Sequence, residues 1–109
     1  MFHKVSRLYR AVHERVSRFP KASRYSLGAH IEKSVLEILE LLYLAQSKRG
    51  PSRLLILNKA DITLKMLMAH LRLAHETRCV NDAGFSELAE RTIEIGRMIG
   101  GWIRATKTP

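Results

Sequence analysis

Residues 35–45 read VLEILELLYLA, and this stretch decides the fold class. Its apolar positions recur three and four residues apart instead of alternating, which is the period of an α-helix and not of a strand. The same period runs through residues 23–48, where one stripe consists of Leu27, Ile31, Val35, Ile38, Leu42 and Ala45. A second stripe beside it consists of Leu36, Leu39, Tyr43 and Leu44. We therefore predict a helix that is apolar over more than half of its circumference.

Three further segments show the same helical period, and short breaks separate all four. In chain order, the predicted helices cover residues 3–18, 23–48, 52–78 and 82–105. The apolar stripe of the first helix consists of Val5, Leu8, Val12, Val16 and Phe19. That of the fourth helix consists of Leu88, Thr92, Ile95, Ile99 and Trp102. Short connections between helices favour antiparallel neighbours. We therefore predict an all-α fold, an antiparallel up-down four-helix bundle that forms a single domain over residues 1–109.

Proline, glycine and asparagine mark the three breaks. Phe19-Pro20 ends the first helix, because the residue before a proline is pushed out of the α region. Gly50-Pro51 is the clearest break in the sequence. Asn81 is the candidate N-cap of the fourth helix, and Ser23 or Ser26 that of the second, because such side chains accept hydrogen bonds from the free N–H groups of a first turn.

The second and third helices carry more apolar residues than a bundle core requires. The core seam of the third consists of Leu57, Ala60, Leu64, Leu67, Leu71 and Ala74, whereas other apolar residues lie off it: Leu55, Ile62, Met66, Met68 and Leu73. An ordinary bundle helix has one apolar stripe and a polar back. Either the core is wide and irregular, or a homo-oligomer buries the surplus, which would otherwise form a large exposed patch. We favour the oligomer.

The composition limits the classes of protein that fit. The chain has 109 residues, a formal net charge of +9 and a single cysteine, Cys79. One cysteine excludes an intramolecular disulfide and fits a reducing compartment. The sequence has no signal-peptide pattern and no run of about 18 apolar residues, so we expect a cytoplasmic protein without a membrane partner.

The positive charge is unevenly distributed along the chain. Residues 1–25 carry a net charge of +6 and residues 51–80 one of +3, whereas the other two segments are balanced. Such sorting indicates a nucleic-acid contact, although a solvated face would also produce it. Aromatic residues make up only 6% of the chain, so bases would find few side chains to stack on. We therefore expect electrostatic contact with phosphates.

Motifs of catalysis and metal binding are absent from the sequence. There is no Glu-x-x-His motif, and His70 and His75 are five residues apart, whereas zinc ligands on a helix are three or four apart. The glycines fit neither a P-loop nor a dinucleotide-binding pattern. We expect no enzymatic activity, no cofactor and no metal, with a haem or metal bundle as an alternative.

Two motifs resemble those of a family of small four-helix proteins. FPKASRYSLG at residues 19–28, followed by Ile31-Glu32, resembles the first-loop signature of this family. The family contains the accessory variability determinant (Avd) of diversity-generating retroelements and the intervening-sequence proteins of some large-subunit ribosomal RNA genes. EIGRMIGGWI at residues 94–103 resembles the Avd branch in particular.

The resemblance to Avd implies a homopentameric barrel without a catalytic site. It also implies two partners, the reverse transcriptase of the retroelement and its template RNA, or DNA, during the error-prone copying of a template repeat into a variable gene. A protein of the intervening-sequence type would instead be a generic RNA-binding or protein-interaction scaffold, and this alternative stays open.

Two sets of residues are the candidate site. Basic residues of the first and third helices are expected to contact nucleic acid and reverse transcriptase: Arg7, Arg10, Arg15, Arg18, Arg53, Lys65, Arg72 and Arg78. A second set is expected to serve packing or oligomer contacts: Pro20, Gly28, Gly96, Gly100, Gly101 and Trp102. The glycines lack a Cβ and let another helix approach closely, and the tryptophan ring fills the end of the core or a subunit interface.

Overall fold

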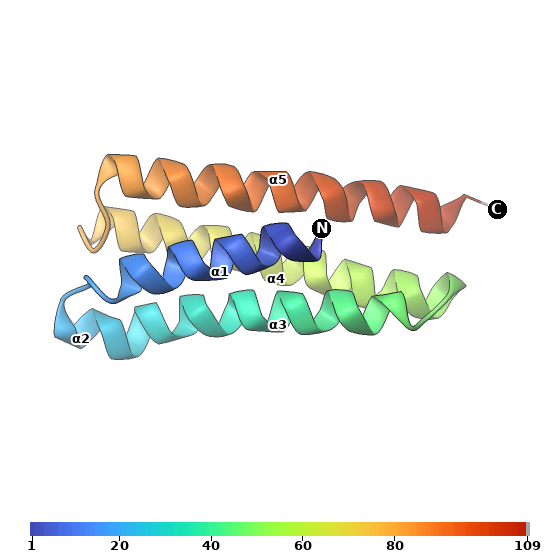
Figure 1. Ribbon diagram of the computed structural model, residues 1–109, viewed down its shortest axis with the longest axis horizontal. Coiled ribbons are helices and arrows are strands. Elements are labelled where there is room, and N and C mark those ends of the chain that lie inside the picture. Colours follow the sequence, from blue (N-terminus) through green and yellow to red (C-terminus); the bar gives the residue numbers. More distant parts are fainter. Residues whose placement is uncertain (109) are drawn as a thin grey trace.

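Four long helical segments run back and forth along one axis in the computed structural model, which describes residues 1–108 (Figure 1). In chain order, the elements are α1 (Phe2–Val16), α2 (Lys21–Ser23), η1 (Arg24–Gly28), α3 (Ala29–Gln46), α4 (Gly50–Glu76) and α5 (Asp82–Lys107). The short helix α2 and the π-helical turn η1 lead directly into α3, so these three elements make one long segment. The described residues contain no strand, and the predicted all-α fold with four helices is confirmed.

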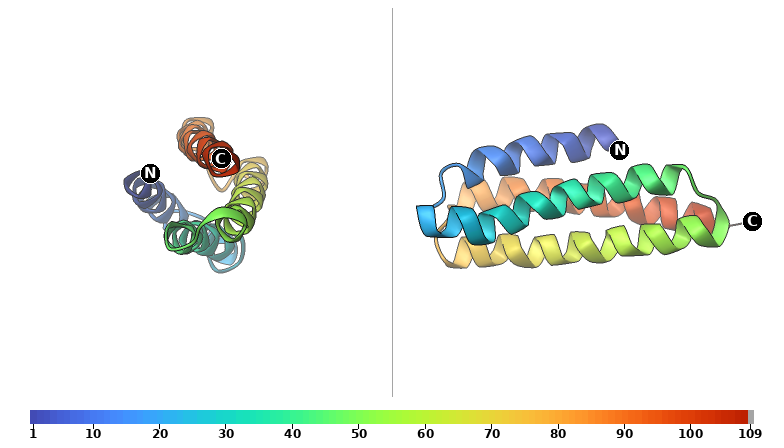
Figure 2. Two further views of the ribbon diagram at one scale, coloured as in Figure 1. Left: turned by 90° about the vertical axis from the view of Figure 1, so that its right-hand side faces the viewer. Right: turned by 90° about the horizontal axis from the view of Figure 1, so that it is seen from below.

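The four long segments occupy the corners of a square when the bundle is viewed along its axis (Figure 2). α3 packs against α1 and α4, and α5 packs against α4 and α1. The bundle measures 48 × 22 × 20 Å. α1 has only 15 residues, whereas α4 has 27 and α5 has 26. Three helices therefore continue beyond the N-terminus at one end of the bundle (Figure 1).

One apolar stripe from each long segment meets the others in the centre of the square. The predicted core positions are buried in all four segments, apart from Leu27 and Trp102, which are half-buried. Complete burial of one leucine or isoleucine side chain contributes about 1.5–3 kcal/mol before the entropy of folding is subtracted. The helical period of the sequence therefore identifies the residues that hold the bundle together.

α2 and α4 begin two residues before the predicted starts of the second and third helices, because proline is tolerated at the start of a helix. Gly50 and Pro51 do not separate two helices but open α4, with Arg49 as its N-cap. The first N–H groups of a helix have no partner within the helix, so a proline there removes no hydrogen bond. Gly50 has a φ of +54°, a conformation that glycine adopts without strain.

The two predicted N-caps have opposite outcomes. Asn81 caps α5, because its Oδ1 accepts a hydrogen bond from the backbone N–H of Gly84 at 2.8 Å. Neither Ser23 nor Ser26 caps the second segment, and that prediction is wrong. Pro20 is the N-cap of α2, and the hydroxyl of Ser26 donates backwards to the carbonyl of Ala22 at 2.9 Å.

Most of the surplus apolar side chains of α3 and α4 stay outside the core, whereas Leu39 and Met68 are half-buried and Leu39 packs against the core. Among residues 1–108, nine large apolar side chains are exposed, and these include Leu36, Tyr43 and Leu44 of α3. Four others lie on α4, and we call them the α4 apolar stripe: Leu55, Ile62, Met66 and Leu73. Spacings of seven, four and seven residues place these four on one face of the helix. A wide irregular core is therefore excluded as the explanation of these residues.

Candidate nucleic-acid interface

The predicted basic residues do not form a single patch, because α5 separates them into two surfaces. α1 and α5 form the first surface, and α4 and α5 form the second. Arg53 and Arg78 lie elsewhere, at opposite ends of α4. Each of these places gives the side chain a different environment.

Arg7 and Arg10 project from α1 beside α5. Both are exposed, and together with the half-buried Arg91 of α5 they line a shallow hollow of about 290 Å³. We call these three residues the α1–α5 basic surface. Glu14 and Glu87 also line the hollow, but neither forms an ion pair with Arg7 or Arg10 among the described residues. Two exposed guanidinium groups on this surface are thus available to phosphates.

Arg15 and Arg18 lie closer to the turn that ends α1. Nη2 of Arg15 is 3.8 Å from a carboxylate oxygen of Glu87, and its side chain is 27% exposed. Nη2 of Arg18 donates to Glu14 at 2.9 Å, and its side chain is 65% exposed. Arg18 is therefore the more accessible of the two.

Arg53 contacts the ends of two neighbouring helices. Its Nε donates to the carbonyl of Ala45 at 2.9 Å and its Nη2 to that of Gln46 at 3.4 Å. Its guanidinium carbon lies 5.4 Å from the ring centre of Trp102 in α5. The last carbonyls of a helix lack partners within the helix, so Arg53 caps α3 and links it to α5. These contacts favour a structural role, and a nucleic-acid contact by Arg53 stays a prediction.

Arg78 forms the turn after α4. Its φ is +62°, in the left-handed region. The backbone N–H of Arg78 donates to the carbonyl of His75, and that of Cys79 donates to Ala74. This is a Schellman motif, in which glycine is usual at the position of Arg78. The side chain of Arg78 is exposed at this end of the bundle.

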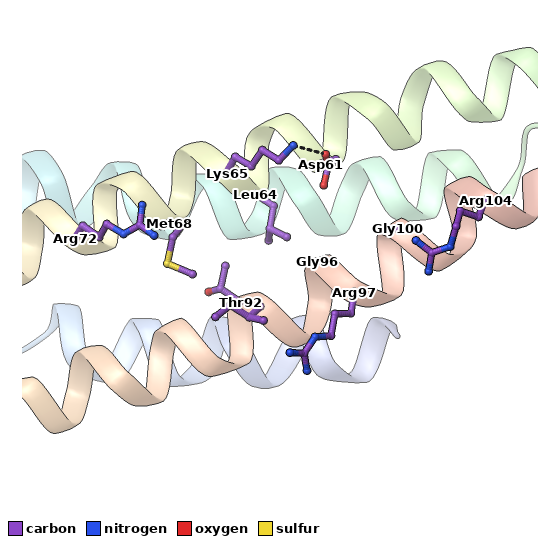
Figure 3. A pocket seen from close by; sticks show the side chains of 11 residues that line it. Asp61, Leu64, Lys65, Met68, Arg72, Thr92, Gly96, Arg97, Gly100 and Arg104 are labelled. Carbon is purple, nitrogen blue, oxygen red and sulfur yellow. Dashed lines mark ion pairs between the residues drawn. The ribbon is translucent and has the colours of Figure 1, made fainter. Parts of the chain in front are cut away.

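Lys65 and Arg72 line a groove between α4 and α5 (Figure 3). This α4–α5 groove has a volume of about 490 Å³. Nζ of Lys65 is 3.0 Å from Asp61, one helical turn away. From the other side, α5 contributes Arg97 and Arg104. The groove therefore combines cations from two helices.

Three arginines of these surfaces were not predicted: Arg91, Arg97 and Arg104. The balanced charge of residues 81–109 concealed them, because a sum over a segment takes no account of helix faces. Arg97 and Arg104 are seven residues apart and therefore share a face. A separate sum of charge for each face of α5 would have identified these arginines.

The residues expected to serve packing fall into two groups. A Cβ at Gly28 would lie 2.7 Å from Cγ1 of Val16, so α1 approaches closely there, beside the corner that Pro20 makes. A Cβ at Gly96 would lie 3.2 Å from Leu64 of α4. Among residues 1–108, no atom of another helix lies within 4 Å of a Cβ placed at Gly100 or Gly101. Their expected role in close packing inside the bundle is therefore wrong, and a role in an oligomer stays a prediction.

The described residues provide neither a metal site nor a membrane span. Residues 1–108 contain no group of three or more His, Cys, Asp or Glu side chains that could hold a metal ion. Their helices include none that is long and apolar enough to cross a membrane. One carboxyl group has a shifted pKa: a hydrogen bond from Lys4 holds the pKa of Glu94 below its usual value of 4.5.

The region matched by a known family includes α1 to α4, the turn at Phe19-Pro20 and the glycine-rich part of α5. A family model described as bAvd-like matches residues 1–106. A search of curated proteins finds no match. Since the family match covers nearly the whole chain, the chain belongs to the bAvd-like family of Avd-type accessory proteins.

Proposed function

We propose that this chain is the non-catalytic accessory protein of a diversity-generating retroelement and holds the reverse transcriptase and the template RNA together. The family match over residues 1–106 is the observation that carries the accessory role. The formal net charge of +9 supports an anionic partner. A reverse-transcriptase gene and a pair of repeats are expected beside this gene, and a locus without them would contradict the proposal.

The proposed RNA contact is the α1–α5 basic surface, together with Arg18. Arg7 and Arg10 are exposed, and among residues 1–108 neither has a carboxylate within ion-pair distance. No aromatic side chain lines the hollow beside them, so bases have nothing to stack on. Phosphate neutralisation is therefore the proposed interaction, which is insensitive to sequence and is weakened by salt.

The proposed working form is a homo-oligomer, a pentamer by resemblance to Avd. The α4 apolar stripe supports self-association, because an exposed apolar surface of this kind is usually buried by a partner. Each additional subunit would repeat the α1–α5 basic surface. A long RNA would then contact several copies at once, which strengthens binding without any new contact.

Filter binding to the template RNA over a series of salt concentrations tests the RNA contact. The double variant Arg7→Glu/Arg10→Glu is expected to lose at least about tenfold in affinity at low salt, and the affinity of the unaltered protein is expected to fall steadily as salt rises. The matched control is Lys33→Glu/Lys48→Glu, which changes the net charge equally at two exposed positions, one in α3 and one in the loop after it.

Either of two results would contradict the RNA contact at this surface. Affinity that does not change with salt would exclude phosphate neutralisation as its basis. Equal losses in the test and control variants would mean that only the total charge matters, and not the position of Arg7 and Arg10.

A further inference from the structure

The α4–α5 groove differs from the α1–α5 basic surface in having an apolar floor. Leu64 and Met68 of α4 and Ile93 of α5 supply that floor, and the side chain of Ile93 is left 48% exposed. The groove follows residues 61–72 of α4 and residues 92–104 of α5. At a rise of 1.5 Å per residue, its length is roughly 16–18 Å, which is about three turns of helix.

Glycines leave part of the α5 side of the groove free of side chains. Gly96 and Gly100 line it one turn apart, so no side chain fills the space above the helix backbone there. A Cβ at Gly100 would meet only the end of the Arg104 side chain, at 3.6 Å. Glycine is costly in the middle of a helix, and no contact with another helix among residues 1–108 requires it at this position.

Cations surround the apolar floor. Lys65 and Arg72 rise from α4 and Arg97 and Arg104 from α5, and all four side chains are exposed (Figure 3). Asp61 is the one carboxylate that lines the groove, and it pairs with Lys65. Among residues 1–108, the three arginines have no carboxylate partner within ion-pair distance. An occupant with acidic edges would pair with them.

We propose that the α4–α5 groove docks an acidic amphipathic helix of a partner protein, about three turns long. Apolar side chains spaced three and four residues apart would cover Leu64, Met68 and Ile93, and flanking carboxylates would pair with the arginines on both walls. The flexible thioether of Met68 adapts to different apolar side chains. The inference rests on the proposed function, because it takes the reverse transcriptase as the partner that supplies this helix.

RNA fits this groove less well than such a helix does. A phosphate backbone would satisfy the arginines but would leave the apolar floor facing water. The lining residues include no phenylalanine, tyrosine or tryptophan on which a base would stack. The two surfaces of the bundle therefore have different partners, with RNA on the α1–α5 basic surface and the acidic helix in the groove.

Fluorescence anisotropy with a designed peptide tests the groove. The probe is a labelled peptide of roughly 16 residues, with leucines three and four residues apart and glutamates between them, and the control peptide is its scrambled sequence. Gly100→Leu fills the groove, whereas Gly101→Leu places the same side chain on the adjacent residue, which does not line it. Both changes raise helix propensity, so both variants are expected to fold.

The expected result is a loss of at least about tenfold in peptide affinity for Gly100→Leu and little change for Gly101→Leu. Arg97→Glu/Arg104→Glu is expected to lose a similar factor, and the scrambled peptide is expected to bind weakly even to the unaltered protein. The same variants are compared in a pull-down of the reverse transcriptase, where Gly100→Leu is expected to reduce capture.

Four results would overturn the inference. Equal binding of the scrambled peptide would mean that charge alone attracts it. An unchanged peptide affinity in Gly100→Leu would place the peptide outside the groove. If Gly100→Leu changed only the molecular mass of the protein in solution, the occupant of the groove would be a second copy of this chain. A tenfold loss of RNA affinity in Gly100→Leu would make the groove an RNA site. Each of these leaves the Arg7→Glu/Arg10→Glu test of the proposed function intact.

Discussion

Arg53 shows how one side chain stabilises the end of the bundle that α1 does not reach. Its guanidinium group meets two carbonyls at the end of α3 and the ring of Trp102 in α5. Hydrogen bonds from a charged donor contribute about 1.5–3 kcal/mol, and a cation–π contact adds roughly 0.5–1 kcal/mol at an exposed site. The side chain is half-buried, so the lower part of this range applies.

Replacement of Arg53 by alanine is therefore expected to lower the free energy of unfolding by about 2 kcal/mol. Urea denaturation measures the change. Arg72→Ala is the control, because Arg72 is exposed and has no ion-pair partner among the described residues; a change within about 0.5 kcal/mol is expected there. Equal effects of the two substitutions would contradict the capping role of Arg53.

Side-chain contacts could be predicted from the sequence where the two partners are only a few residues apart in the same helix turn. Asn81 bonds to a backbone group three residues away, and its cap was predicted because that geometry is fixed by the first turn of any helix. Arg53 bonds to carbonyls seven and eight residues earlier, across a change of direction between α3 and α4. From the sequence, Arg53 was predicted only as a positive charge on a basic helix. Its capping contacts were not predicted, because they depend on the conformation of the turn between α3 and α4.

Among contacts between elements, an ion pair joins α1 to α5. Nζ of Lys4 lies 2.6 Å from Glu94, and the hydrogen bond between them lowers the pKa of that carboxyl group. A carboxyl whose pKa is lower in the folded chain stabilises the fold above its unfolded pKa. This stabilisation disappears as the pH falls below 4.5 and through the folded pKa.

Glu94→Gln is accordingly expected to unfold at a lower temperature than the unaltered protein at neutral pH. As the pH falls below 4.5 and through the folded pKa, the two melting temperatures are expected to converge, because the carboxyl group becomes protonated in both states. Glu90→Gln, on an exposed position of the same helix, is the control. A difference between Glu94→Gln and the unaltered protein that persists in acid would show that the ion pair is not its cause.

The elements themselves follow from the period of the apolar residues. All four stripes were predicted with the correct face inward, because a helix in a bundle has to bury one side. The starts of the second and third segments were misplaced by two residues each, since Pro20 and Pro51 were interpreted as breaks. Proline ends a helix that precedes it but also opens one that follows it, and the sequence alone does not weigh these two effects.

For the whole molecule, the sequence predicts which helices carry excess positive charge but not how charge is distributed around each helix. The excess on the first and third helices is present in the sequence, but the balanced charge of the fourth is divided between two sides of α5. Glu87 and Glu94 pair with residues of α1, whereas Arg97 and Arg104 line the α4–α5 groove. Both cationic surfaces therefore depend on α5, the helix that a sum over the sequence describes as neutral.

The exposed α4 apolar stripe predicts that the whole molecule self-associates. Ile62 and Met66 are 59% and 55% exposed at the centre of the α4 apolar stripe. Light scattering at micromolar concentration is expected to give a multiple of the chain mass of 12.5 kDa. Ile62→Glu/Met66→Glu is expected to lower that multiple, because two carboxylates would be buried without partners at the interface.

The matched control for self-association places the same charge on another exposed surface. Ala22 and Tyr25 lie at the corner between α1 and α3, and the side chain of Tyr25 is 72% exposed. Ala22→Glu/Tyr25→Glu is expected to keep the mass of the unaltered protein. A mass of 12.5 kDa for the unaltered protein, or dissociation by both double variants alike, would mean that the α4 apolar stripe does not hold copies of this chain together.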